Sequence, residues 1–240
     1  MNADRMPARD EDQQGARRLA LGAGLGLVAA VLTIALPLIF LYLATYNPGG
    51  FFTFSSTLIE DLSILLLAGA ILFLISLFVY RRAFATLRKV ESRFWIASVL
   101  CLIGSIGFLL IVVLAAVILS STSSLQTCLH GSPSHALSCL RSNQPIGAYS
   151  GLLGFALTWL GGLGIVLGLF FAGHRFVRGA LAGSAVLYLL LLLVLVGPFI
   201  ALLYAVPGTQ YVLLIAPVLA ILAPALVLAG VRQPFASVRP

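Results

Sequence analysis

The residues best suited to metal or redox chemistry lie together in one polar stretch, residues 120–146. Cys128, His130, His135 and Cys139 supply two thiols and two imidazoles there, in a C-x-H-x4-H-x3-C pattern. Four such donors could hold a zinc ion, although this spacing differs from the common zinc motifs. On the oxidising side of a membrane, two neighbouring thiols tend to pair. We therefore expect a Cys128–Cys139 disulfide, with a metal site and free thiols as the alternatives.

Glu60 and Asp61 form a second candidate site, because adjacent carboxylates at the mouth of an apolar run could collect a cation or admit a proton. Apart from this pair, only Glu91 is acidic after residue 12. Thr57 and Glu60 match the S/T-x-x-E capping box, in which each side chain bonds the backbone amide of the other residue. Asp61 would add negative charge in the first turn, where the helix dipole favours it. We therefore expect Thr57 and Glu60 to cap a helix, with an ion or proton site as the alternative.

The elements that carry these residues are predicted to be membrane helices. The chain has 240 residues, of which 61% are hydrophobic and only 9% charged, whereas soluble domains carry about a quarter charged residues. Uncharged apolar runs of 18 or more residues predict transmembrane helices, since lipid offers backbone amides no other partner. We predict an all-α fold, a polytopic bundle of six helices within residues 19–230. Its spans are about 19–45, 58–80, 94–119, 147–172, 179–205 and 210–230.

Two polar tails flank this bundle. Residues 1–18 balance four arginines against four acids, a composition typical of a disordered tail, and residues 231–240 form the second tail. The first apolar run exceeds the length of a signal-peptide core, so we expect it to be retained as a helix.

The basic residues predict the orientation of the bundle. With the N-terminus inside, all but Arg141 of the 14 lysines and arginines fall on the inner side, as the positive-inside rule requires. Both termini are therefore expected in the cytoplasm, with the bundle in the cell membrane. The same placement accounts for the net charge of +7 without a nucleic-acid partner. The basic stretch 80–95, which ends in Trp95, is expected to anchor at the inner face of the bilayer, against anionic headgroups.

Small residues follow one face of the fourth predicted helix at a spacing of seven or less. They are Gly147, Gly151, Gly154, Thr158, Gly161 and Gly168. Small side chains let membrane helices approach closely, and this close approach supplies much of their packing energy. We expect this stripe to pack against neighbouring helices, with a substrate groove or a hinge as the alternative.

The spans contain no ionisable side chain away from their ends, which disfavours proton-coupled transport and haem ligation by histidine. The sequence also lacks a nucleophile–base pair, a phosphate loop and a buried acid pair, so we expect no enzyme and no cofactor. The chain is predicted to be an accessory, assembly or lipid-organising membrane component, with other membrane subunits or further copies of itself as partners. The alternative is a permease or channel for a small neutral solute.

Two stretches resemble a known group of proteins. They are YRRAFATLRKVESRFWIASVLCLIGSIGFLL at residues 80–110 and GGLGIVLGLFFAGHRFVRGAL at residues 161–181. Together they resemble an uncharacterised archaeal family of multi-span membrane proteins of unknown function, over about residues 78–182. The resemblance implies a multi-pass helical bundle, and it implies neither an activity nor any site residue.

Overall fold

The structure is a computed structural model that describes residues 5–33, 56–120, 145–204 and 215–232. Six helices account for nearly all of these residues. They are α1 (Arg5–Thr33), α3 (Ser56–Leu87), α4 (Phe94–Ser120), α7 (Pro145–Arg175), α8 (Gly179–Tyr204) and α10 (Ile215–Arg232). Within the described ranges, 5 helices are long and apolar enough to cross a membrane, namely α1, α3, α4, α7 and α10. The all-α expectation is confirmed for these ranges, and the five long helices indicate a multi-pass membrane protein.

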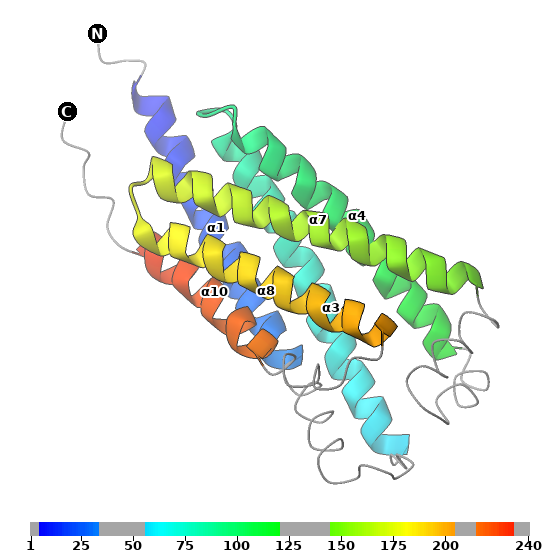
Figure 1. Cartoon of the computed structure of the whole chain (residues 1–240). Coiled ribbons are helices and arrows are strands. Elements are labelled where there is room, and N and C mark those ends of the chain that lie inside the picture. Colours follow the sequence, from blue (N-terminus) through cyan, green and yellow to red (C-terminus); the bar gives the residue numbers. More distant parts are fainter. Residues whose placement is uncertain (1–4, 34–55, 121–144, 205–214, 233–240) are drawn as a thin grey trace.

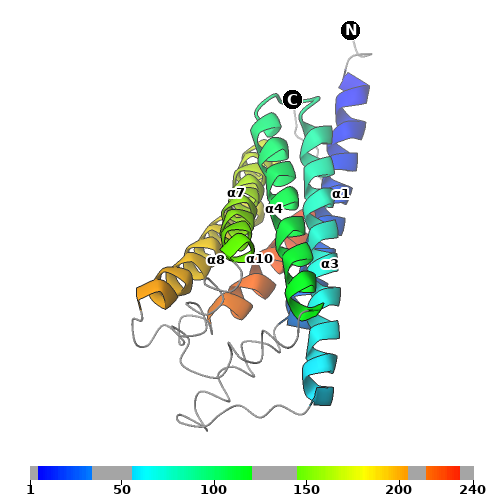
Figure 2. The same ribbon diagram turned by 90° about the vertical axis from the view of Figure 1, so that its right-hand side faces the viewer.

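The helices form a closed ring in chain order. Each helix packs against the next one in the sequence, and α10 completes the ring by packing against α1. Figure 1 shows the ring flattened into two layers, with α1, α3 and α4 in one layer and α7, α8 and α10 in the other. The start of α1, the end of α10 and the two short turns at residues 88–93 and 176–178 lie at one end (Figures 1 and 2). We call it the basic end, because most of the cationic side chains gather there.

The first helix corrects the predicted disorder of residues 1–18. Helix α1 begins at Arg5, so most of this polar tail is helical. Once an apolar span has nucleated a helix, each further residue extends it at little cost. Gly15 and Ala16 of the extension are buried, and Gly15 lies against Leu87 at the end of α3. Composition alone did not reveal this contact.

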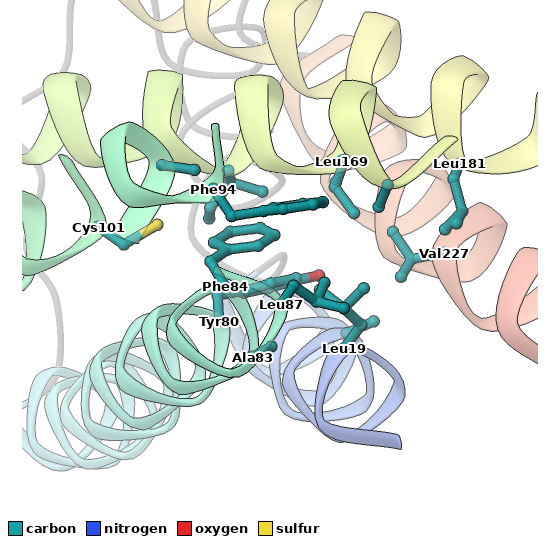
Figure 3. Close-up of a cluster of buried hydrophobic side chains, with 14 of the residues drawn as sticks. Leu19, Tyr80, Ala83, Phe84, Leu87, Phe94, Cys101, Leu169, Leu181 and Val227 are labelled. Atoms are coloured by element: carbon teal, nitrogen blue, oxygen red, sulfur yellow. The ribbon is translucent and has the colours of Figure 1, made fainter. Parts of the chain in front are cut away.

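A core of large side chains fills the middle of the ring near the basic end. Every helix contributes to it, and its members include Leu19, Tyr80, Phe84, Phe94, Leu169, Leu181 and Val227 (Figure 3). The rings of Phe84 and Phe94 stack with centroids 6.1 Å apart, and Tyr80 stacks on the other side of Phe84 at 6.1 Å. Offset aromatic pairs at this separation add to the stability that burial provides. All six helices therefore contact one another through this core, near the basic end.

Candidate functional site: the charged cap and the core beneath it

The charged residues of the basic end form a network centred on Arg175 of α7. Its guanidinium donates two hydrogen bonds to Asp12 of α1, Nε to Oδ1 at 3.0 Å and Nη2 to Oδ2 at 3.0 Å. Both side chains are only 24% exposed. Two parallel bonds between arginine and a carboxylate are among the stronger polar contacts in proteins. Because α1 and α7 stand across the ring from one another, this pair crosses the mouth of the ring.

The turn between α3 and α4 adds further ion pairs. Lys89 Nζ lies 2.9 Å from Glu11 Oε1, and Glu91 lies 3.7 Å from Arg175 and 3.9 Å from Arg93. The Lys89 side chain is 66% exposed, so water weakens its contribution. We call Glu11, Asp12, Lys89, Glu91, Arg93 and Arg175 the charged cap. Asp12 precedes the core residue Leu19 by seven positions, so the cap lies about 10 Å beyond the core along α1.

Arg178 makes a separate connection at the same end. It lies in the turn between α7 and α8, is buried, and donates from Nη1 to the carbonyl of Gly230 in the last turn of α10. The final carbonyls of a helix lack partners within the helix and carry its negative dipole end. The arginine satisfies one of these carbonyls and compensates that charge. This contact fastens the α7–α8 turn to α10.

A group of hydroxyls lies inside the ring among α1, α3 and α8. Ser76 donates to the Gly22 carbonyl at 2.8 Å, and the hydroxyls of Tyr80 and Tyr188 lie 3.4 Å apart. Among the described side chains, every buried nitrogen or oxygen has a hydrogen-bond partner. These hydroxyls carry no charge, and they bond to one another or to the backbone. Their chemistry suits packing or weak contact with a neutral solute.

The predicted small-residue stripe on α7 faces two different partners. A Cβ added to Gly161 would lie 3.2 Å from the backbone nitrogen of Gly104 on α4 and closer still to its Cα, and one added to Gly154 would lie 2.9 Å from the Gly107 carbonyl oxygen. Gly168 instead lies against the Phe84 ring of α3. The α4 and α7 backbones therefore touch at two matched pairs of glycines. Nearer the basic end, Gly168 of the stripe leaves room for the Phe84 ring.

Three other members of the stripe complete its description. The Thr158 hydroxyl donates to the Gly154 carbonyl within α7 at 2.8 Å. Gly147 and Gly151 lie in the first turns of the same helix, and their surroundings fall outside the described side chains. Gly104 and Gly107 were absent from the predicted stripe. Their spacing of three within an apolar span was the signal for a second small-residue surface.

The remaining predicted site residues lie partly or wholly outside the described residues. Cys128 and Cys139, with His130 and His135, belong to such a segment, so the disulfide and its alternatives stay predictions. Helix α3 begins at Ser56, two residues before the start at Leu58 that a cap at Thr57 requires. Thr57 and Glu60 therefore lie within its first turns. Their side-chain contacts are not described. Cys101 is a buried free thiol in the core.

Comparisons with known proteins add nothing to this geometry. No protein-family model matches the chain, and no curated protein or solved structure is significantly similar to it. The resemblance of residues 78–182 to an archaeal family therefore stays a prediction.

Proposed function

We propose that the protein is a non-catalytic integral membrane component that acts as an accessory, assembly or lipid-organising bundle. The observation that carries this proposal is the filled ring at the basic end. All six helices meet there in one apolar core, and the α4 and α7 backbones touch at paired glycines. The charged cap lies over this core. An interior filled by large side chains suits a part that holds other components in place.

The chemistry of the described residues supports a non-catalytic role. No group of three or more His, Cys, Asp or Glu side chains in these ranges could hold a metal ion. The acidic residues of the charged cap form ion pairs with arginine and lysine, an arrangement typical of structural ion pairs. We further propose that the bundle lies in the cell membrane with the basic end in the cytoplasm, as the positive-inside rule predicts.

A permease for a small neutral solute is the second candidate. The hydroxyls of Ser76, Tyr80 and Tyr188 inside the ring favour it. Figure 2 shows α8 leaning away from α3 and α4 toward the end opposite the basic end. In this alternative the hydroxyls would meet a solute that enters from that end, and the apolar core would be the closed side of the pathway.

Osmotic swelling of proteoliposomes separates the two candidates. We expect vesicles that contain the protein to swell in glycerol or urea no faster than protein-free vesicles of the same lipid. Faster swelling that the Tyr188→Phe variant reduces would overturn the proposal in favour of a permease, because that substitution removes one hydroxyl and little volume.

The assembly role has its own measurement. Purification from the native membrane in mild detergent is expected to yield a particle heavier than the 25.4 kDa chain, after correction for bound detergent. A single bare chain in this preparation would count against a role in assembly.

A further inference from the structure

Three neighbouring helices carry exposed side chains in rows that end in arginine at the basic end. The rows are Arg17, Leu21, Val28 and Val31 on α1; Leu67, Ile71, Ile75, Phe78 and Arg82 on α3; and Ile215, Val218, Leu222, Ala229 and Arg232 on α10. Spacings of three, four or seven place each row on one side of its helix. Helix α1 packs against both α10 and α3, so the three rows are adjacent. We call Arg17, Arg82 and Arg232 the arginine face.

The positive charge of the arginine face is not neutralised within the described part of the chain. None of the ion pairs among the described residues involves these arginines. The acidic residues at about the same level along the bundle axis are paired with other residues. Glu11 pairs with Lys89, and Asp12 and Glu91 pair with Arg175. Asp10 is exposed, but it precedes Arg17 by seven residues, which is about 10 Å along the helix. The arginine face therefore has capacity to bind an external anion.

The helices on the other side of the ring, α4, α7 and α8, carry no exposed arginine among their described residues. The exposed side chains at this end of α4 and α7 are Trp95, Ile96, Phe170 and His174, Arg175 belongs to the charged cap, and Arg178 is buried against Gly230. The exposed cations Arg88, Lys89 and Arg93 lie in the α3–α4 turn, beyond Leu87, the last residue of α3. The positive-inside rule accounts for cations at one end of a membrane protein. It does not account for an arginine at the end of each of three adjacent exposed apolar rows.

We propose that the arginine face binds the phosphate groups of anionic phospholipids, which makes one side of the bundle selective for these lipids. Each arginine stands where an exposed apolar row ends, which is where a headgroup lies when acyl chains cover the row. A guanidinium binds phosphate oxygens through two parallel hydrogen bonds, and anionic lipids attract each such cation appreciably. The inference rests on the proposed membrane placement, and it adds the class of lipid and the side of the bundle that holds it.

Native mass spectrometry of the full chain in mild detergent tests this proposal. The protein is titrated with phosphatidylglycerol and, separately, with phosphatidylcholine. We expect the wild type to retain phosphatidylglycerol at the lower concentration. The triple variant Arg17→Gln, Arg82→Gln, Arg232→Gln is expected to weaken this retention on the order of a hundredfold, at about fivefold per arginine where the contributions add. The single variants Arg17→Gln and Arg232→Gln change only exposed positions, and each should weaken it about threefold to fivefold.

A matched variant controls for net charge. Arg81→Gln, Arg88→Gln, Arg93→Gln removes the same charge at the α3–α4 corner, within the predicted headgroup anchor, and is expected to weaken retention of phosphatidylglycerol much less than the first triple variant does. Equal losses in both triple variants, or no loss in the first, would overturn the proposal. Displacement of the lipid by millimolar inorganic phosphate would assign the site to free phosphate instead. Because this assay measures lipid retention and the swelling assay measures solute flux, the inference and the proposed function can fail separately.

Discussion

At the scale of single residues, Val177 is the one described residue other than glycine with a positive φ, 53°. It occupies the position after α7 where a Schellman motif places glycine. The Val177 amide bonds the His174 carbonyl at 3.3 Å, and the Arg178 amide bonds the Gly173 carbonyl at 2.8 Å, which is the pattern of that motif. A left-handed backbone crowds the Cβ of any residue other than glycine, and β-branching makes the conformation rarer still. The turn therefore holds local strain next to the buried Arg178.

Replacing Val177 by glycine is expected to stabilise the protein by about 1 kcal/mol, because the strain disappears. The valine side chain is 83% exposed, so its removal sacrifices little packing. Thermal unfolding in detergent measures the change. Val177→Ala is the control: it keeps the left-handed Cβ and should gain less. A glycine variant less stable than the wild type would contradict the presence of backbone strain at Val177.

The contacts made by charged residues show what the sequence could not predict at this scale. The gathering of cations at one end followed from the sequence, because each polar boundary between spans could be located. The partners did not follow, because Asp12 and Arg175 are 163 positions apart. Which acid meets which arginine depends on the order of helices in the ring. The predicted disorder of residues 1–18 also gave no reason to expect ion pairs from Glu11 and Asp12.

At the scale of elements, the contact between α4 and α7 depends on glycine. A Cβ on Gly161 would meet the Gly104 backbone below contact distance, and one on Gly164 would lie 2.9 Å from the Cys101 nitrogen. Backbone atoms cannot move aside as a flexible side chain can, so the helices would have to separate. The spacing of seven predicted a small-residue face on α7. It could not predict that α4 supplies the opposite surface, because that depends on which helices are neighbours.

Gly161→Ala is expected to destabilise the bundle by about 2 kcal/mol, since overpacking against backbone strains both helices. Gly183→Ala on α8 is the matched control, because no described atom lies within 4 Å of a Cβ there, and alanine is the better helix former. Thermal unfolding of both variants in the same detergent provides the comparison. Equal stability of the two variants would contradict the close contact between α4 and α7.

At the scale of the whole molecule, six apolar runs predicted six helices, and the structure extends these helices at the basic end. Helix α3 continues to Leu87, seven residues past the predicted span, and α7 continues to Arg175. Hydropathy predicts where an apolar span ends, but a helix can continue into polar residues until its backbone turns. The sequence did not predict the closed ring, in which α10 packs against α1. This contact joins helices from the two ends of the chain, and no local pattern indicates it. The ring's even number of helices brings those ends to the same side.

The positive-inside rule predicts which side of the membrane the basic end faces, and cysteine labelling tests this prediction. Arg88 is exposed in the turn after α3, so a cysteine there samples the compartment that the basic end faces. In a chain whose Cys128 and Cys139 are replaced by serine, we expect Arg88→Cys to resist a membrane-impermeant maleimide in intact cells. It should react once the cells are permeabilised.

Arg141→Cys is the control for this labelling, because residue 141 belongs to the segment between α4 and α7. That segment must lie on the side opposite the α3–α4 turn if α4 crosses the bilayer. We therefore expect this variant to react in intact cells, and Cys101 to stay unreactive because it is buried. Labelling of Arg88→Cys but not Arg141→Cys in intact cells would invert the orientation and move the arginine face to the outer leaflet. Labelling of both from outside would mean that α4 does not cross the membrane.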